Sequence, residues 1–485
     1  MRDRGQILLL STYELGHQPL GLASPLGFLA RAGWGAACAA LDLSVEPLDP
    51  ARVRAARFIA VSVPMHTALR LGARVAARVR ALNPTCHLAF HGLYAALNAE
   101  YLFTLGADAV LAGEIEEPLV RLVAAVAAAR DPRCPAPVDG VTLRTDGPPA
   151  RPHLARQAFA VPERDALPSL DRYARLLGAG AAGDGALAGY VEASRGCLHH
   201  CTHCPIPPVY GGRLFVVPPD VVLEDVRRQA AAGAAHVTFG DPDFLNAPTH
   251  ALRLARALHG ELPHLTFDFT AKVEHLLRHR AMLPELRALG CVFVVSAFES
   301  TSDLVLAHLA KGHTRADAAR ALQVVHAAGL ALRPTFVAFT PWTTLDDYLD
   351  MLAFIDRERL VHHVDPVQYG LRLLVPPGSL LLRAPAMAPF LGPLEPERLA
   401  YRWTHPDPVM DALQSAVACA VEEVALAQPG AGGGGRAADE LDREAFRRVR
   451  ALARAARGLP VWPLASQTLP RHPSRVPRLT EPWFC

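Results

Sequence analysis

The sequence predicts an α/β protein in which a doubly wound, Rossmann-like domain precedes a partial (β/α)6 barrel and a helical C-terminal region. The first observation is that short, continuously apolar runs alternate with helical patterns over the first 130 residues, as in parallel sheets covered on both faces. The second is a further series of six strand-like runs, separated by helical stretches, which is typical of barrels. The expected boundaries are 1–130 for the first domain, 131–186 for a linker, 187–385 for the barrel, and 386–485 for the helical region with its Pro-rich tail.

Five strands are expected in the first domain, and each is a short apolar run followed by a helical pattern. The runs are QILLLS, AACAALDL, RFIAVSV, CHLAFHG and DAVLAGE, and the helices are expected to open at Pro25, to span 68–82 and 95–105, and to begin at Pro118. Ligands of such sheets bind at the carboxyl ends of the strands. The loops there carry Ser62, His66, Gly92, Gly113, Glu114 and Glu116. Because no G-x-G-x-x-G follows the first strand, a dinucleotide is disfavoured.

The linker is rich in Pro, Gly, Ala and Arg, and one or two strands are expected in it at VTLR. The barrel strands are expected at GYVEAS, HVTFGD, LTFDFTA, CVFVVSAFE, LRPTFVAF and DPVQYGLRLL. Helices are expected between them over 219–233, 249–261, 281–289, 303–310, 315–328 and 345–358. Residues 395–460 have a helical pattern interrupted by PGAGGGGRA, and the tail after them is too rich in proline for regular structure.

Composition narrows the class of protein. The 485 residues carry a formal net charge of +2 with basic residues scattered singly, so neither nucleic acid nor an anionic membrane is an expected partner. The apolar run at the N-terminus, residues 7–10, is too short for a signal peptide, and no run of about 18 apolar residues occurs. An odd total of nine cysteines argues against a secreted disulfide framework. A cytoplasmic location is expected.

Three cysteines lie within eight residues, in CLHHCTHC directly after the first barrel strand. The spacing is Cys197-x3-Cys201-x2-Cys204, and three thiolates can bind three irons of a [4Fe–4S] cluster while the fourth iron stays open. The alternative is a structural zinc site completed by one of the three histidines of this stretch, His199, His200 or His203. No other Cys-x-x-Cys occurs, and the remaining cysteines are isolated, as expected for buried apolar side chains.

Two further stretches accompany this cluster, FGDPDF after the second barrel strand and FESTSDLVLAHLAKGHT after the fourth. Together the three stretches resemble the radical S-adenosylmethionine (SAM) superfamily, with His203 where that family usually has an aromatic residue. The resemblance implies a [4Fe–4S] cluster on the three cysteines and SAM bound at Gly240, Asp241, Glu299 and Ser300. From the residues alone, Asp241 and Asp243 can also be read as a turn and a helix cap.

The resemblance also implies an activity. In the superfamily the open iron chelates the methionyl group of SAM, and reductive cleavage yields a 5′-deoxyadenosyl radical that abstracts hydrogen. An electron donor such as a flavodoxin or ferredoxin is therefore expected. The substrate, a small molecule or a peptide, stays open, and the expected outcome is methylation of an unactivated carbon or a related rearrangement.

A Rossmann-like domain ahead of such a barrel resembles the cobalamin-binding subclass. Cobalamin is therefore expected between the two domains, with Ser62, Gly92, Gly113 and Glu116 as contacts. The usual Asp-x-His-x-x-Gly motif is absent, and ELGHQPLG offers His17 as the candidate axial ligand. The competing interpretation is a degenerate domain kept for packing or docking.

The last residues, RLTEPWFC, resemble a cobalamin-type radical SAM family whose tail reads Cys-Cys-Ala-Glu-Pro or Cys-selenocysteine-Ala-Glu-Pro. Cys485 would be the first member of that pair, and a UGA codon is expected after it. A vicinal thiol–selenol pair would be redox-active, since exchange proceeds through the ionised form. Two other functions stay open: a non-catalytic iron–sulfur redox or sensor protein with a thiol tail, and a zinc-stabilised binding module.

Overall fold

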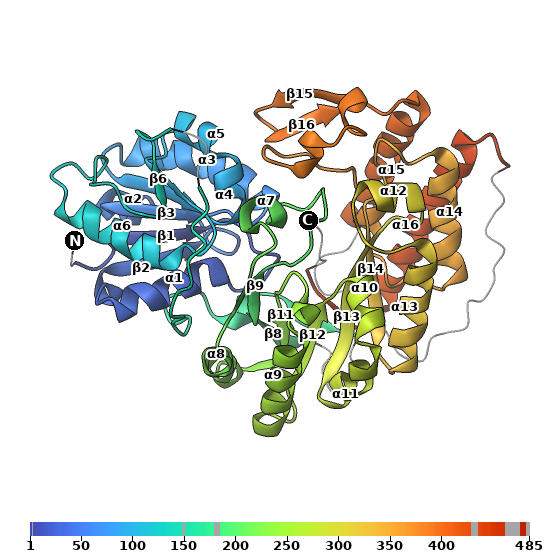
Figure 1. Ribbon diagram of the computed structural model, residues 1–485, viewed down its shortest axis with the longest axis horizontal. Coiled ribbons are helices and arrows are strands. Elements are labelled where there is room, and N and C mark those ends of the chain that lie inside the picture. Colours follow the sequence, from blue (N-terminus) through green and yellow to red (C-terminus); the bar gives the residue numbers. More distant parts are fainter. Residues whose placement is uncertain (2, 148–150, 179–184, 428–434, 461–475, 482–485) are drawn as a thin grey trace.

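The computed structural model describes residues 1, 3–147, 151–178, 185–427, 435–460 and 476–481, and it contains two α/β units followed by a helical region (Figure 1). The first unit lies on the left of Figure 1 and the second on the right, and helix α7 of the second unit contacts helix α4 of the first. In the described part of the chain, no helix combines the length and the apolar character that crossing a membrane requires.

The sheet of the first unit has the order β2-β1-β3-β4-β5-β6. Five strands are parallel, and the sixth pairs antiparallel with β5 at the edge. Their bounds are β1 Ile7–Ser11, β2 Cys38–Asp42, β3 Phe58–Ser62, β4 His87–His91, β5 Ala109–Leu111 and β6 Val141–Leu143. The strand order reverses between β1 and β3, which is the point where open α/β sheets bind their ligands.

Helices cover both faces of this sheet, which confirms the doubly wound prediction. Side chains of β1 alternate between two apolar cores, with Ile7 and Leu9 in one and Leu8 and Leu10 in the other. The first core includes α1 Leu20–Arg31 and α6 Glu116–Ala128. The second includes α2 Pro50–Ala55, α3 His66–Leu82, α4 Leu93–Leu97 and α5 Ala99–Thr104. Pro25, expected to open a helix, lies inside α1.

The second sheet has the order β14-β13-β12-β11-β8-β7-β17, with five parallel strands in one half-barrel. The parallel strands are β8 Ala186–Val191, β11 Ala234–Phe239, β12 Thr266–Thr270, β13 Cys291–Glu299 and β14 Ala331–Phe336. The sixth expected strand is reduced to one bridge between Phe339 and Arg372. The segment before it forms a 3-10 helix, η6 Pro366–Gly370, whose Gln368 side chain accepts a hydrogen bond from Phe336 N (3.0 Å) at the end of β14.

The helices of this unit follow the expected stretches closely. They are α7 Ile206–Tyr210, α8 Pro219–Ala231, α9 Pro248–Glu261, α10 Val273–Arg278, α11 Leu283–Ala288, α12 Asp303–His308, α13 Arg315–Ala327 and α14 Leu345–Arg357. Further short 3-10 helices are η1 Gly35–Ala37, η2 Leu170–Arg172, η4 Phe244–Asn246, η5 Arg280–Met282, η7 Leu380–Arg383 and η8 Ala388–Phe390.

The C-terminal region departs from expectation in two places. A hairpin, β15 Leu391–Glu395 with β16 Ala400–Trp403, overlaps the stretch expected to be helical. The tail also contains a short strand, β17 Arg478–Leu479, which pairs antiparallel with β7 Arg175–Leu177 of the linker. The expected helices are present as α15 Pro408–Leu426 and α16 Gly435–Ala456, which pack together and against η6.

Candidate functional site

The three clustered cysteines lie on a loop, residues 197–204, at the carboxyl end of the first barrel strand. In the sequence, the loop and α7 lie between the two strands of an antiparallel ribbon, β9 Ser194–Gly196 and β10 Leu214–Val216. Gly196 adopts φ +78°, and an added Cβ there would lie 2.3 Å from the carbonyl oxygen of Arg213. A glycine is therefore required where the chain enters this cysteine loop.

The three thiols of this loop interact electrostatically with one another, and two of them are buried. Cys197 and Cys201 are buried and Cys204 is half-buried, and all three are free. Burial raises the pKa of Cys204 to about 12, with smaller contributions from Cys201 and Cys197. Burial likewise raises the pKa of Cys197, whose Sγ accepts a hydrogen bond from Asn246 Nδ2 (3.5 Å). Buried thiols of this kind ionise when they bind a metal, so the arrangement suits a thiolate-bound metal centre.

The loop histidines face other groups. His203 Nε2 lies 3.2 Å from Glu299 Oε1, and His199 Nε2 lies 3.5 Å from Asp243 Oδ2. The His200 ring packs on Gly212, where an added Cβ would lie 2.7 Å from Nε2. This arrangement favours a three-cysteine centre with an open position over the alternative of a zinc site completed by histidine.

Glu299 ends β13 beside the cysteine loop. Its backbone has φ +64°, which is unfavourable for a non-glycine residue, and its side chain is buried. Burial acts to raise the pKa of Glu299, but Lys311 and His203 outweigh it and hold that pKa at about 2. Lys311 Nζ donates a hydrogen bond to Glu299 Oε1 (3.2 Å) and also interacts electrostatically with Cys201. The next residue, Ser300, is buried, and its Oγ accepts a hydrogen bond from Ser302 N (3.1 Å).

Gly240 and Asp241 follow β11 at the same edge of the sheet. A Cβ on Gly240 would lie 2.0 Å from the Tyr190 hydroxyl oxygen, so this position requires glycine. The Asp241 carboxylate accepts hydrogen bonds from Ala193 N (2.8 Å) and Ser194 Oγ (2.5 Å). These bonds fix the segment that leads into the cysteine loop, a positioning role that the sequence did not predict.

Replacing Asp241 with asparagine should remove a pH dependence of stability. Burial raises the pKa of Asp241 to about 7 despite its hydrogen bonds, whereas an unfolded aspartate titrates near 3.9. The native state therefore retains a proton that the unfolded chain releases, and stability falls as pH rises from about 4 to about 7. This pKa difference corresponds to on the order of 4 kcal/mol. Urea unfolding of the cluster-free protein at pH 5 to 8 measures the slope.

Asparagine preserves the shape and hydrogen bonding of the protonated acid, so Asp241→Asn should fold and show a flatter profile. The matched control is Asp139→Asn, since the Asp139 side chain is 90% exposed. Identical pH profiles for Asp241→Asn and the wild type would refute the assignment.

The residues predicted to contact cobalamin are spread along the edge of the front sheet, and the chain itself covers most of them. A Cβ added to Gly92 would lie 2.9 Å from the Val63 backbone. A Cβ added to Gly113 would lie 2.2 Å from the His153 carbonyl oxygen. Ser62 is buried, with its Oγ 2.4 Å from where a Cβ on Gly21 would lie. The close approaches that these glycines allow are therefore used for packing within the protein.

The candidate axial ligand, His17, is also packed against protein. Its ring stacks on Tyr190 with centroids 4.5 Å apart, and the residue is only 3% exposed. Burial lowers the pKa of His17 to about 3, so the ring is neutral near pH 7. A corrin ring would have to displace Tyr190 or a neighbouring group to reach it.

Glu116, the remaining predicted contact, belongs to a buried ionic network that joins the two units. Arg195 of β9 lies 2.6 Å from Glu116 Oε1, 3.6 Å from Glu114 Oε2 and 2.9 Å from Glu192 Oε2. The Tyr210 hydroxyl donates a hydrogen bond to Glu114 Oε1 (3.3 Å). Since Arg195 precedes Cys197 by two residues, this network fixes the entrance of the cysteine loop against the front sheet. Sequence motifs gave no signal for Arg195.

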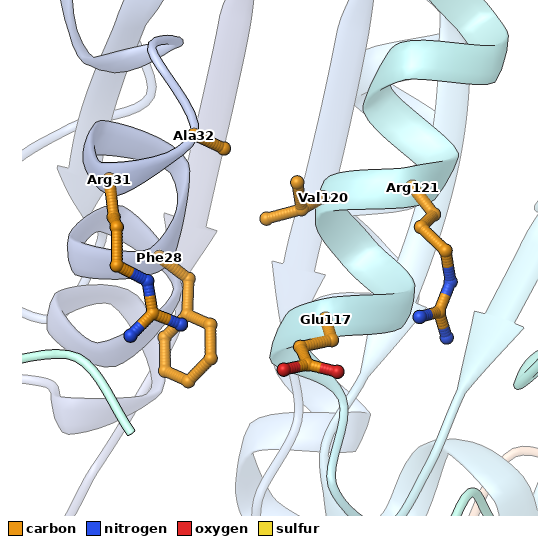
Figure 2. Close-up of a pocket in the computed structure, with 6 residues that line it drawn as sticks. All are labelled: Phe28, Arg31, Ala32, Glu117, Val120 and Arg121. Carbon is orange, nitrogen blue, oxygen red and sulfur yellow. The ribbon is translucent and has the colours of Figure 1, made fainter. Parts of the chain in front are cut away.

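A surface pocket of about 240 Å³ lies apart from this site, between α1 and α6 (Figure 2). Arg31 and Phe28 line one side, with Glu117 and Val120 opposite. The Arg31 guanidinium lies 4.5 Å above the Phe28 ring and donates a hydrogen bond to Phe159 O (3.0 Å) in the linker. These contacts indicate packing of the linker on α1.

Comparisons with known proteins agree with this site. Residues 191–355 match the model of the Radical SAM superfamily, a segment that contains the cysteine loop, Gly240 and Glu299. This part of the chain is a radical SAM domain, and the superfamily implies a [4Fe–4S] cluster and SAM. The three thiols on one loop, two of them buried and one half-buried, fit such a cluster.

Solved structures share the fold over a longer stretch. The cobalamin-dependent SAM radical enzyme OxsB, solved with aqua-cobalamin and SAM, aligns with a TM-score of 0.69 and 14% identity over 92% of this chain and 72% of that chain. The radical SAM methyltransferase TsrM from Kitasatospora setae aligns with a TM-score of 0.58 and 18% identity over 73% of this chain and 71% of that chain. At such identities the likeness establishes the fold.

Curated relatives match about a third of the chain. The tRNA-2-methylthio-N(6)-dimethylallyladenosine synthase of Thermus thermophilus is 26% identical over 185 residues, which cover 36% of this chain and 38% of the relative. The enzyme of the same name from Deinococcus radiodurans is 27% identical over 195 residues, 36% of each chain. The chain thus spans well under half the length of these relatives.

Proposed function

We propose that this chain is a radical SAM enzyme that reductively cleaves SAM and uses the resulting radical on an unactivated carbon. The observation that supports it is that the three cysteines of one loop and Glu299 lie together at the carboxyl edge of a radical SAM domain. When bound, the cluster would supply the electron that cleaves the sulfonium, leaving methionine and a 5′-deoxyadenosyl radical. Cys197, Cys201 and Cys204 would bind three of its irons.

The surrounding side chains have distinct tasks in this proposal. Lys311 keeps Glu299 ionised, so that its carboxylate can accept hydrogen bonds from the ribose hydroxyls of SAM. Asn246 donates to Cys197 Sγ, an interaction that tunes the thiolate. Gly240 and Ser300 are proposed to contact SAM from the ends of β11 and β13, where Gly240 packs on the Tyr190 hydroxyl and Ser300 follows Glu299. We propose a flavodoxin or ferredoxin as the electron donor, and free thiols support a cytoplasmic location.

The direct test is anaerobic incubation of purified protein with SAM and dithionite. Formation of 5′-deoxyadenosine supports the proposal. A brown protein that binds four irons per chain but never forms 5′-deoxyadenosine would instead support the redox or sensor function, and a colourless protein with one zinc would support a binding module.

Glu299→Gln should weaken SAM binding while leaving the cluster in place. The amide keeps the size of the side chain but loses the charge that Lys311 and His203 organise, and loss of a charged hydrogen-bonding group costs about 1.5–3 kcal/mol, or roughly 10- to 150-fold in affinity. Equilibrium binding of SAM to the reconstituted protein measures it. Glu397→Gln, at an exposed position, is the control. Unchanged affinity in Glu299→Gln would remove Glu299 from the SAM site.

Cobalamin is the second part of the proposal, with methyl transfer as the reaction it would serve. Its support is the fold likeness to OxsB and TsrM, which extends over the front sheet in the case of OxsB. The sequence-predicted contacts do not fit an open corrin cradle, because Gly92, Gly113 and His17 pack against protein. No catalytic step is therefore derived through cobalamin. Anaerobic titration with hydroxocobalamin, followed by desalting and absorbance, tests it: one equivalent retained supports binding, and none supports a domain kept for packing.

A redox-active tail is the third part, and Cys485 itself lies outside the described residues. The last described residues support the proposal by their position. Glu481 Oε1 accepts a hydrogen bond from the Tyr13 hydroxyl (2.7 Å) in the front unit, and Thr480 N donates to Arg175 O (2.8 Å). The tail is therefore anchored where the two units meet. Sequencing the codons after Cys485 tests the pair: TGA followed by codons for Ala-Glu-Pro supports it, and TAA or TAG contradicts it.

A further inference from the structure

His199 of the cysteine loop belongs to a second cluster of metal-binding side chains. Asp243 follows β11 and His275 lies in α10 after β12, so three separate segments contribute. His275 Nδ1 lies 2.8 Å and His199 Nε2 3.5 Å from Asp243 Oδ2, and all three donor atoms lie within 4.8 Å of one another. The two imidazole rings are tilted, with centroids 4.6 Å apart.

These separations match a shared metal ion. Zinc and similar divalent ions bind imidazole nitrogen and carboxylate oxygen at about 2.0–2.2 Å, so two neighbouring ligand atoms lie about 2.8–3.6 Å apart in octahedral or tetrahedral geometry. The measured values of 2.8 and 3.5 Å fall within this range.

The unused hydrogen-bonding capacity of the histidines is an independent observation. Among the described residues, neither His275 Nδ1 nor His199 Nε2 has a hydrogen-bond partner of acceptable geometry, although both atoms are buried. The His275 side chain is 6% exposed and that of Asp243 0%. An ordinary His–Asp–His hydrogen-bonded triad would use these nitrogens, because an unsatisfied buried polar atom is costly.

The carboxylate is held in place before any ligand arrives. Asp243 Oδ1 accepts a hydrogen bond from Leu245 N (3.0 Å), and Oδ2 accepts one from Lys272 N (3.3 Å). Lone pairs of the carboxylate remain for a cation, since each oxygen has two.

We propose that His199, Asp243 and His275 bind one divalent transition-metal ion, Zn²⁺ or Fe²⁺, separate from the iron–sulfur cluster. Two imidazoles and one carboxylate suit these ions, and water would complete the coordination. The ion would tie the cysteine loop to the ends of β11 and β12, holding Cys197 and Cys201 on either side of His199. This inference rests on the geometry of the three side chains and does not depend on SAM cleavage.

Metal analysis of anaerobically reconstituted protein tests the site. The wild type should contain one divalent ion per chain in addition to the four cluster irons and four sulfides. His275→Ala should lose that ion and keep the cluster sulfide and its absorbance. Cys201→Ala should show the opposite pattern. His279→Ala is the matched control, because its ring lies 5.6 Å from that of His275 and it is not among the three ligands.

Cobalt(II) gives a readout independent of activity. Protein stripped with a chelator should bind one Co²⁺ with visible d–d absorption, and Zn²⁺ and Fe²⁺ should compete for it. Absence of stoichiometric Co²⁺ binding to the wild type overturns the proposal. If His275→Ala does not fold, Asp243→Asn replaces it, and retention of the additional ion in a folded variant also overturns it.

Discussion

Replacement of Cys201 with alanine is expected to abolish cluster assembly and the formation of 5′-deoxyadenosine. Cys201 is buried beside Cys197 and Cys204, and the other two thiols alone cannot bind three irons. Changes in groups that only support a metal ligand lower metal affinity or activity about 10- to 100-fold. Loss of a ligand itself should lower them by more than about 100-fold. Iron and sulfide analysis together with product formation measures the effect.

Cysteines elsewhere supply the controls for this variant. Cys419 on α15 and Cys134 in the linker are exposed and distant from the loop in sequence, so alanine at either position should leave iron content and product unchanged. A Cys201→Ala protein that retains four irons and forms product at a rate near that of the wild type would show that the cluster is bound elsewhere.

Replacement of Arg195 with alanine is expected to cause the largest loss of stability. Arg195 is the cation shared by Glu114, Glu116 and Glu192, and without it these carboxylates are buried without compensation. Breaking a buried ion pair in this way costs about 3–5 kcal/mol. Burial already raises the pKa of Glu114 to about 7 with Arg195 present, so in the variant the carboxyl groups would take up protons. The loss should therefore be larger at pH 8 than at pH 6.

Chemical unfolding of the cluster-free protein at the two pH values measures this loss. Arg227→Ala is the matched control, since Arg227 also contacts two glutamates, Glu224 and Glu261, but its side chain is 46% exposed. Such exposed pairs contribute about 0–1 kcal/mol. Equal losses in the two variants would show that the Arg195 network does not join the two units.

Sequence patterns predicted the strands and the cysteine loop, because each of these depends on residues that are close together in the chain. Continuous apolar runs located β1 to β5 because both faces of those strands are buried. The spacing of three cysteines after a strand located the cysteine loop, because all three cysteines lie within one short segment of the chain. The sixth barrel strand was not formed, because a 3-10 helix occupies Pro366–Gly370 and only one bridge, between Phe339 and Arg372, remains.

Features that depend on distant contacts were missed. Arg195 meets Glu116 across about 80 residues of sequence, and no periodicity marks such a pair. Gly113 was expected to allow a ligand close to the backbone, whereas in the structure the carbonyl group of His153 in the linker packs there. Lys311 lies within the stretch FESTSDLVLAHLAKGHT that stood out in the sequence, but its contact with Glu299 became visible only in the structure. The hairpin of β15 and β16 was hidden by a composition that also suits helices.

The proposed function depends on a [4Fe–4S] cluster that the three cysteines bind and whose fourth iron is open to SAM. Electron paramagnetic resonance of the dithionite-reduced protein, recorded without and with SAM, tests it most directly. A [4Fe–4S]⁺ signal that changes on addition of SAM, and that is absent in Cys201→Ala, is the predicted result. Absence of such a signal, or a signal that SAM leaves unchanged, would show that the protein has no cluster with an iron open to SAM.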